Sequence, residues 1–433
     1  MRPGARLQAS IDVLTEIAER HRPAGEALAD WGRSHRFAGS GDRAAIGNLV
    51  YDAMRQRASA AWRMGDDGPR GLALGALVAS WGLDAATLQS WCDGSRHAAA
   101  PLTAAELERI EAPPETEPPD WVRGDYPEWL HEAFTQAFGP QAPQEGAALA
   151  RRAPVDLRVN TLKADREKAL KALKRVSPEP TPWAPTGIRI APLAGPGKSP
   201  HLEAEAGHGK GWFEVQDEGS QIAALMTGAG PRRQVADLCA GAGGKTLALA
   251  ARMENTGQIH AYDADRMRLR PIFDRLRRAG VRNAQVLPPG ETGALDALAG
   301  RMDVVVIDAP CSGSGVWRRR PDAKWRLRPQ NIETRNAEQR RVLDLGAPLV
   351  RPGGRLVYIT CSVLPQENGA QVSSFQERHP DFELLPYREA WAEAMATEPP
   401  ASADGADDTL LLTPARHGTD GFFIAVLVRS DGA

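Results

Sequence analysis

Two cysteines each follow directly after a run of β-forming residues. Cys311 ends the sequence Asp308-Ala309-Pro310-Cys311, which comes after MDVVVI, and Cys361 lies in Thr360-Cys361-Ser362, which comes after GRLVYI. Ligands of open α/β folds bind at the carboxyl ends of the strands, so both thiols are expected to line one cleft. A single cysteine at a strand end is most often a small buried apolar residue, whereas two that converge favour chemistry.

The reaction that suits such a pair of thiols is methylation at carbon 5 of a pyrimidine. Carbon 5 is a weak nucleophile, so a thiolate must first add to carbon 6 and form a covalent intermediate. The proton on carbon 5 must then pass to a base, so that the thiol is expelled. We expect Asp308 to hydrogen-bond the edge of the base near N3 and N4 and to stabilise charge as the ring is attacked.

A glycine-rich turn at residues 241–246 follows another predicted strand, QVADLCA, and precedes a predicted helix. Backbone amides at a helix N-terminus suit an anionic ligand group. The P-loop pattern fails because Cys239 stands where a glycine is required, and the dinucleotide fingerprint fails because Thr246 stands at its sixth position. A turn that serves only tight packing remains the alternative.

Asp263 ends the next predicted strand, 26 positions after Asp237. A carboxylate at this place can accept hydrogen bonds from both ribose hydroxyls of an adenosine ligand. Because the phosphate-binding motifs fail, S-adenosylmethionine fits better than a nucleotide, with its carboxylate on the glycine turn and its ribose on Asp263. The alternative is that Asp263 is only a solvated carboxylate at a strand end.

The elements that must position these residues alternate between short β-forming and helical runs from about residue 232 onward. This alternation predicts repeated β-α-β units and an open parallel sheet covered on both faces. We expect the last run, DGFFIAVLVR, to close an edge of that sheet. Near the N-terminus, apolar residues at three- and four-residue steps predict helices instead, with Asp42 and Thr103 as N-caps.

These patterns divide the chain into four segments. We predict an all-helical domain at 1–111, a Pro- and Glu-rich linker at 112–120, an α+β segment at 121–226 and a catalytic domain at 227–433.

The composition of the 433 residues is that of a globular protein, with 42% hydrophobic and 25% charged residues. The net charge of −2 means that a nucleic-acid partner must be held by a local basic surface. The four cysteines form no CxxC pair, so we expect neither a zinc site nor a disulfide framework. Without an apolar run of membrane-spanning length or a secretory signal, we expect a cytoplasmic protein without membrane contact.

Several of these segments, taken in order, resemble the motifs of the RsmB/Sun type of RNA cytosine-5 methyltransferase. They are DLCAGAGGKT, YDAD, DAPCSGSGVWRRRPDAKW, TCSVLPQENG and DGFF, with RVNTLK and FEVQDEGSQ ahead of them. The helical region, above all GDRAAIGNLVYDAMR, is similar to the NusB-like RNA-binding domain of bacterial RsmB proteins. The resemblance implies a Rossmann-like, seven-stranded S-adenosylmethionine methyltransferase domain, preceded by a small α+β segment and an all-helical N-terminal domain.

The same resemblance implies roles for individual residues. Cys361 is the expected nucleophile, Cys311 is expected to assist product release, and Lys245 and Asp308 are expected to touch both the cofactor and the active centre. The residues expected to line the S-adenosylmethionine site are Cys239, Ala240, Gly241, Ala242, Gly243, Gly244, Lys245, Asp263, Glu291 and Asp308. DNA cytosine methyltransferases attack with the cysteine of a Pro-Cys motif, so Cys311 is the nucleophile under that alternative.

The chain departs from the family pattern at two places. The glycine turn of the family usually reads Cys-Ala-Ala-Pro-Gly-Gly-Lys, whereas Gly241 and Ala242 stand here where Ala and Pro are expected. The family also places an aspartate after the third strand, at the adenine end of the cofactor, where this chain reads VLPPGE and Glu291 is the expected substitute. If Glu291 does not serve, the alternative is an RNA-binding assembly factor that has lost turnover.

We expect the substrate to be RNA, with 16S ribosomal RNA favoured over transfer RNA because of the NusB-like region, and the protein to act as a monomer. Residues 317–328 interleave Trp317 and Trp325 with arginines and are expected to contact the RNA backbone and splayed bases. The basic residues between 266 and 282 are expected to form a solvated helix face.

Overall fold

The computed structural model describes residues 1–431, which form two compact units. Unit 1 consists of Met1–Ala153, Pro192–Pro200 and Trp317–Leu327, and unit 2 consists of Pro154–Ala191, His201–Val316 and the described residues from Arg328 onward. The two units do not coincide with the four segments predicted above. Unit 1 includes the helices up to residue 153 and two short pieces from later in the chain, because these pieces pack with it.

Unit 1 consists of helices around one apolar core. Leu7, Leu14 and Ile17 are buried on one face of its first helix, at the spacing that an amphipathic helix requires. The last helix of this unit carries Trp325, which packs against the same core. The helices are α1 (Pro3–Arg20), α2 (Ala24–Ser34), α3 (Ser40–Arg55), α4 (Arg57–Met64), α5 (Pro69–Trp81), α6 (Ala85–Trp91), α7 (Ala104–Glu111), α8 (Asp120–Arg123), α9 (His131–Phe138), α10 (Ala142–Leu149) and α17 (Pro321–Arg326).

The two predicted N-caps have different outcomes. Thr103 caps α7 as predicted, since its side chain accepts a hydrogen bond from the amide of Glu106. The prediction for Asp42 is wrong, because α3 begins at Ser40 and Gly39 is its N-cap. Asp42 is the third residue of the helix, and from there its carboxylate accepts a hydrogen bond from the amide of Gly39 and pairs with the amino group of Met1.

Unit 2 contains a small antiparallel sheet, in which the strand order is β2-β3-β1-β4. The buried carboxylate of Glu214 on β4 pairs with Arg275 and Arg278, so this part of the basic helix 272–279 docks on the small sheet and is not a solvated face. The elements of this part are β1 (Val155–Val159), α11 (Arg166–Ala172), β2 (Glu179–Pro180), β3 (Gly187–Ile190), α12 (Ala206–Gly209) and β4 (Phe213–Val215).

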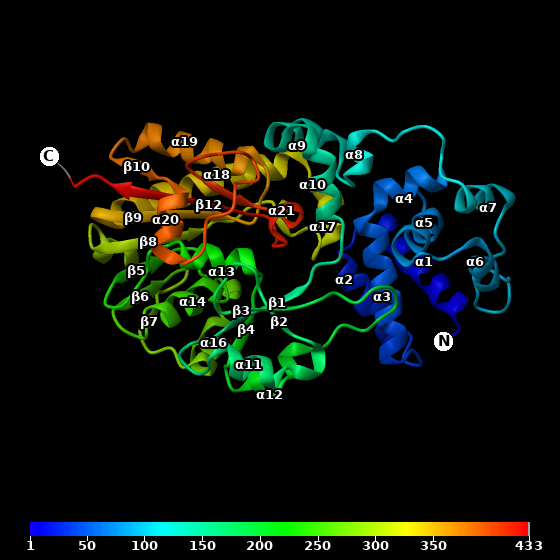
Figure 1. Cartoon of the computed structure of the whole chain (residues 1–433), viewed down its shortest axis with the longest axis horizontal. Coiled ribbons are helices and arrows are strands. Elements are labelled where there is room, and N and C mark those ends of the chain that lie inside the picture. Colours follow the sequence, from blue (N-terminus) through cyan, green and yellow to red (C-terminus); the bar gives the residue numbers. More distant parts are fainter. Residues whose placement is uncertain (432–433) are drawn as a thin grey trace. The chain divides into compact units, whose positions relative to one another are not determined.

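The second sheet of unit 2 has the strand order β10-β12-β9-β8-β5-β6-β7, which the labels in Figure 1 follow. Strands β5 to β9 are parallel to one another, while β12 and β10 run antiparallel. Its strands are β5 (Gln234–Asp237), β6 (Gln258–Ala261), β7 (Ala284–Val286), β8 (Met302–Asp308), β9 (Val350–Thr360), β10 (Phe382–Leu385), β11 (Leu410–Leu412) and β12 (Phe422–Arg429).

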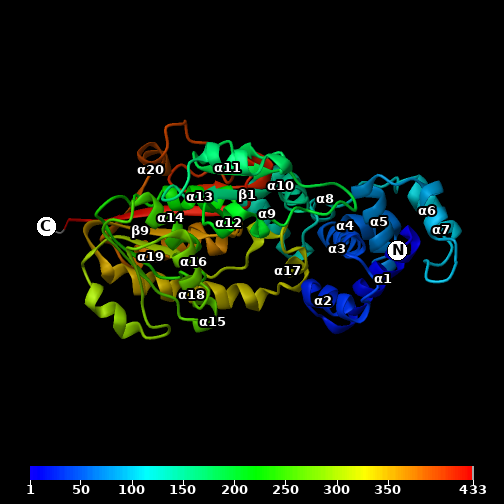
Figure 2. The ribbon, with the colours of Figure 1, turned by 90° about the horizontal axis from the view of Figure 1, so that it is seen from below.

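Alternate side chains of the buried strand β8 pack against helices on opposite faces of this sheet. Val304 and Val306 belong to the core that contains residues of α13, α14 and α20. Val305 and Ile307 contact the other layer, where they lie against Gly346 of α18. Figure 2 shows α13 and α14 on one side of the strands and α18 on the other, which is the doubly covered arrangement predicted for a parallel sheet. The remaining helices are α13 (Glu218–Leu225), α14 (Gly244–Arg252), α15 (Arg266–Leu269), α16 (Ile272–Ala279), α18 (Pro329–Gly346), α19 (Gly369–Arg378), α20 (Tyr387–Ala394) and α21 (Pro414–His417).

The predicted seven-stranded sheet is confirmed, and the short strand β11 pairs with β12 as an eighth member. The prediction that DGFFIAVLVR closes a sheet edge is wrong, because β12 lies between β9 and β10. The edge strand on this side of the sheet is β10, four residues long, which the sequence pattern did not predict. Complete burial of Phe423 to Leu427 agrees with the inner position of β12.

Within residues 1–431 no helix has both the length and the apolar character needed to span a bilayer. The same residues contain no cluster of three or more His, Cys, Asp or Glu side chains arranged to hold a metal ion.

Candidate active site

Three strands of unit 2 that precede predicted site residues end at the same edge of the large sheet. Asp237 ends β5, Asp308 ends β8 and Thr360 ends β9, and the parallel register pairs Asp237 with Val306 and Asp308 with Ile359. The loops that follow these strands carry the predicted site residues. The sequence pattern therefore predicted correctly that the glycine turn and both cysteine segments share one edge.

The sulfur atoms of Cys311 and Cys361 lie 3.4 Å apart. A carboxylate that the sequence analysis did not single out holds their two loops together. Glu367 is fully buried at the end of a short 3-10 helix, Pro365–Glu367. It accepts hydrogen bonds from the amide of Ser312 (2.7 Å), the hydroxyl of Ser312 (2.5 Å) and the hydroxyl of Ser362 (2.6 Å), so each residue after a cysteine is bound to the same side chain.

A pair of glycines fixes the far end of the same loop. The amide of Gly421 donates to the carbonyl of Gly315 over 2.8 Å, and the amide of Gly315 donates to the carbonyl of Cys361 over 3.0 Å. A Cβ on Gly315 would lie 2.2 Å from the carbonyl oxygen of Gly421, so only glycine fits there. This contact gives the SGSG and DGFF motifs a structural reason, which is to bring three loops into contact around the two thiols.

The surroundings of the Cys311 thiol disfavour its ionisation. The hydrogen bond with Cys361, burial and the charge of Glu367 raise the pKa of the Cys311 thiol well above its ordinary value. Cys311 therefore keeps its proton more readily than an ordinary cysteine, and a thiol is a much weaker nucleophile than a thiolate.

The glycine turn adopts backbone conformations that require glycine. Gly243 has φ of +85°, and a Cβ there would lie 2.6 Å from the side chain of Ile272. Gly241 has φ of +49°, and its amide donates to a carboxylate oxygen of Asp263 over 2.9 Å. The turn leads directly into α14, whose first amides have no partner within the helix.

Lys245, in the first turn of α14, connects the glycine turn to the Asp308 segment. Its buried ammonium group donates to Asp308 over 3.0 Å and to the hydroxyl of Ser220 over 2.8 Å, and it lies 5.2 Å from the centre of the Phe422 ring. Ser220 is a second site residue that was not predicted, although it lies in the FEVQDEGSQ motif. Lys245 and Asp308, each predicted to touch both the cofactor and the active centre, are hydrogen-bonded to each other, and their contact with the cofactor stays a prediction.

Asp237 lies beneath the turn, fully buried. One of its carboxylate oxygens accepts from Thr246 over 2.7 Å, whereas the other has no hydrogen-bond partner. Burial raises the pKa of Asp237 to about 7, and the nearby carboxylates of Asp308 and Asp263 act in the same direction. Burial and these three carboxylates also raise the pKa of the Cys239 thiol, so we expect Cys239 to be unreactive.

These residues match the donors and acceptors that S-adenosylmethionine needs. Helix-terminal amides at Gly244 and Lys245 suit the carboxylate of its amino-acid part, while carboxylates suit its ammonium group and ribose hydroxyls. The buried oxygen of Asp237 without a partner is an acceptor available to a ligand donor. The charge interactions of Cys239 with Asp237, Asp263 and Asp308 indicate that these groups surround one small region.

Glu291 and Trp317, for which the sequence predicts contacts with the cofactor and with RNA, make no hydrogen bond with this cluster. Glu291 is exposed after β7, and the neighbouring Gly290 lies beside the carbonyl of Ala264 in the loop that follows Asp263. The role predicted for Glu291 at the adenine end stays a prediction. Trp317 is 1% exposed and stacks on Phe134 at 6.0 Å within unit 1, so the prediction that it contacts splayed bases is wrong.

Comparison with protein families gives two matches. Residues 227–428 match the family described as 16S rRNA methyltransferase RsmB/F, and residues 126–193 match the RsmF/B-like ferredoxin-like domain. A probable ribosomal RNA small subunit methyltransferase B from Synechocystis is 33% identical over 314 residues, which are 70% of this chain and 67% of that protein. The matched region thus spans about two thirds of the relative's length.

Two crystal structures are similar to the whole chain or to most of it. The structure of PH0851 covers 99% of this chain and 99% of its own, with a TM-score of 0.72 and 25% identity. The structure of NSun6 from Pyrococcus horikoshii with SFG covers 71% of this chain and 99% of its own, with a TM-score of 0.62 and 23% identity, and it supports the fold.

Proposed function

The chain belongs to the RsmB/F family of ribosomal RNA methyltransferases, and we propose that it methylates carbon 5 of a cytosine in 16S ribosomal RNA. As a member of this family it uses S-adenosylmethionine. When bound, S-adenosylmethionine supplies the methyl group. The single observation that carries the finer proposal is the 3.4 Å approach of the Cys311 and Cys361 sulfurs at the carboxyl edge of the sheet.

In this proposal Cys361 adds to carbon 6 of the cytosine and Cys311 assists the release of the product. The resemblance to RsmB/Sun enzymes motivates this order, and the raised pKa of the Cys311 thiol fits a group that holds a proton. Addition of the Cys361 sulfur forms a sulfur–carbon bond and places electron density on carbon 5. After methylation, carbon 5 loses its proton to a base and the same sulfur–carbon bond breaks, which returns Cys361 and releases 5-methylcytosine.

Asp308 and Lys245 bind and orient the base in the proposed mechanism. The carboxylate of Asp308 is held by Lys245 and remains about one-third exposed, so it can still face a ligand. We propose that it hydrogen-bonds the edge of the cytosine, and that Lys245, fixed by Ser220, keeps the carboxylate in place. A fixed hydrogen-bonding group stabilises charge that develops on the ring without reorganisation.

The RNA substrate is expected to be ribosomal because the relatives that match are named as ribosomal RNA methyltransferases. We further propose that residues 1–111 form the NusB-like RNA-binding region and that the protein acts in the cytoplasm. The cytosine must be turned out of its stack, which favours flexible or single-stranded sites.

The test is transfer of labelled methyl groups from S-adenosylmethionine to 16S ribosomal RNA, with the product mapped by bisulfite sequencing. We expect Cys361→Ala to abolish transfer and Cys311→Ala to accumulate a covalent protein–RNA adduct that is visible on a denaturing gel. A Cys92→Ala variant is the matched control, because this thiol is buried in the core of unit 1 and belongs to no part of the proposed site, and it should form no adduct.

Two results would contradict the proposal. Methylation that depends on Cys311 and persists in Cys361→Ala would reverse the roles of the thiols, as in DNA cytosine methyltransferases. Absence of transfer to any RNA, together with tight RNA binding and no S-adenosylmethionine binding, would identify the chain as an assembly factor that has lost turnover.

A further inference from the structure

Unit 1 contains a cavity of about 880 Å³ that shares no residue with the candidate active site. It lies between the start of α1, the end of α2, the end of α6 and the loop that follows α6. Sites for small ligands usually have volumes of roughly 300–1,000 Å³, so this cavity has room for a nucleotide and its neighbours.

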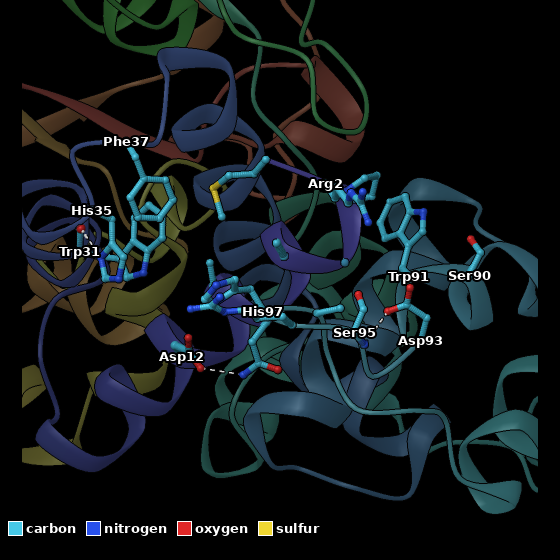
Figure 3. A pocket seen from close by; sticks show the side chains of 18 residues that line it. Arg2, Asp12, Trp31, His35, Phe37, Ser90, Trp91, Asp93, Ser95 and His97 are labelled. Carbon is cyan, nitrogen blue, oxygen red and sulfur yellow. Dashed lines mark hydrogen bonds between the residues drawn. The ribbon is translucent and has the colours of Figure 1, made fainter.

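The walls of the cavity present aromatic rings, which Figure 3 shows from close by. The ring of His35 stacks on Trp31 with centroids 4.4 Å apart and an interplanar angle of 8°, and Phe37 meets His35 edge-on at 5.8 Å. Trp91 lies on the other side of the cavity, with His97 between the two walls. The flat face of an unstacked base is the ligand that such rings accept best, because every nucleobase has a π-face.

Phe37 is 74% exposed, the largest exposed fraction among the large apolar side chains of residues 1–431. The end of α2 and the following turn carry it away from the core, and it makes only the contact with His35 among the ring contacts of the described residues. The face of the Phe37 ring is therefore free to stack on a base that enters the cavity.

Polar groups at the rim complete the chemistry of a nucleotide site. Arg2 and Arg96 are exposed there and can donate to a phosphate, while Asp12 and Asp93 can accept from the amino group of a base. His97 has φ of +72°, a conformation that non-glycine residues rarely adopt and that is often found at binding sites. Rings, cations and acceptors together suit a nucleotide better than an apolar peptide helix, which would leave these charges without partners.

We propose that this cavity binds an unpaired nucleotide of the RNA substrate, with the base against Phe37 and the His35–Trp31 stack and the phosphate toward Arg2 and Arg96. This inference rests on the proposed function for the identity of the ligand as RNA. It adds a second contact between protein and RNA, at a site that no step of the methyl transfer uses.

The experiment measures the affinity of the full chain for short single-stranded RNA by fluorescence anisotropy at fixed salt. Phe37→Ala and Arg96→Ala change exposed side chains, so both variants should fold. We expect each to weaken binding at least about fivefold, the effect of losing one base–aromatic contact or one phosphate contact. Trp129→Ala is the matched control, since Trp129 is also an exposed aromatic residue of unit 1 and lies outside the cavity.

Ultraviolet crosslinking followed by mass spectrometry gives an independent readout. We expect RNA adducts on peptides that contain residues 31–37 or 90–98. Methyl transfer by the same variants should show a higher KM for RNA and an unchanged kcat at saturating RNA, because the cavity contributes no reacting group.

The outcomes separate this inference from the proposed function. Weaker RNA binding in the cavity variants supports the inference even if the wild type transfers no methyl group, in which case only the proposed reaction fails. Unchanged affinity, adducts confined to other peptides and intact methyl transfer overturn the inference and leave the proposed function in place, and a protein ligand then becomes the occupant to test.

Discussion

The sulfur of Cys311 lies 3.4 Å from the sulfur of Cys361, although 50 residues separate them in the chain. The two residues that follow, Ser312 and Ser362, both donate to the buried carboxylate of Glu367. A thiol pair held this closely suits the proposed two-step chemistry on one base, and it also exposes the protein to oxidation.

The first prediction concerns that oxidation. Treatment with diamide should join the two sulfurs, as each thiol loses one hydrogen and diamide takes up both. We expect loss of methyl transfer, restored by dithiothreitol, and a Cys311–Cys361 disulfide in the peptide map. A Cys92→Ala variant should behave like the wild type, because Cys92 is buried in the core of unit 1 and burial raises the pKa of its thiol. Inactivation without that disulfide would show that diamide acts elsewhere.

The second prediction concerns Glu367 as a positioning residue. In the wild type one carboxylate oxygen of Glu367 accepts from the hydroxyl of Ser362, and the other accepts from the amides of Ser312 and Gln339. In Glu367→Gln an amide nitrogen, which is a donor, replaces one of these two acceptors. We expect kcat to fall at least about tenfold and the free energy of unfolding to fall by about 1–3 kcal/mol, the usual effect of an unpaired buried group. The affinity for S-adenosylmethionine should stay within about twofold, since no bond to the glycine turn changes.

Glu377→Gln is the matched control for this variant, because Glu377 is exposed on α19. It should leave both kcat and stability unchanged. If Glu367→Gln loses stability but keeps the wild-type kcat, Glu367 serves the fold alone.

The sequence predicted the candidate site where the chemistry depends on strand ends. Asp308, Cys311 and Cys361 follow strands whose periodicity is plain, and parallel strands bring their carboxyl ends to one edge. Glu367 and Ser220 escaped prediction because their roles depend on which loops meet, and local periodicity does not record that. The one carboxylate in the second cysteine motif, TCSVLPQENG, was the available signal for Glu367.

The fold shows the same division between local and long-range information. The alternation of strands and helices predicted the parallel sheet and its covered faces. The place of β12 inside the sheet depends on pairing with β9 and β10, which lie far from it in sequence. The burial of Trp317 and Lys324 in unit 1 has the same cause, because a run of aromatic and basic residues reads as a surface until its packing partners are known.

The third prediction concerns stability and the carboxyl group of Asp237. Its pKa is about 7 in the folded protein and near 3.8 ordinarily, because burial disfavours the charged form. The folded state therefore holds a proton that the unfolded state loses, and the resulting stability is present below about pH 4 and is lost as the pH rises to 7. Relative to Asp237→Asn, the wild type should lose on the order of 4 kcal/mol across this window.

Urea unfolding of both proteins at several pH values, without S-adenosylmethionine, measures this difference. Asp274→Asn is the control, because that carboxylate is 85% exposed and should give no such slope. A constant difference between the wild type and Asp237→Asn from pH 4 to 7 would contradict the prediction.

The fourth prediction concerns Lys324, whose buried ammonium group donates to the carbonyl of Arg55 over 2.8 Å and lies 4.9 Å from the centre of the Trp325 ring. Burial lowers the pKa of Lys324 to about 8 from its ordinary 10.5, and the charge of Asp125 offsets this only in part. The unfolded state thus holds the proton more tightly, so the wild type should gain stability relative to Lys324→Met as the pH rises from 8 to 10.5, by on the order of 3 kcal/mol.

Urea unfolding of both proteins at pH 7, 8.5 and 10 checks this, with Lys171→Met on an exposed helix face as the control. A difference that stays constant or shrinks with rising pH would mean that Lys324 reaches solvent, and the tight packing of Trp317–Leu327 against α3 would then be wrong.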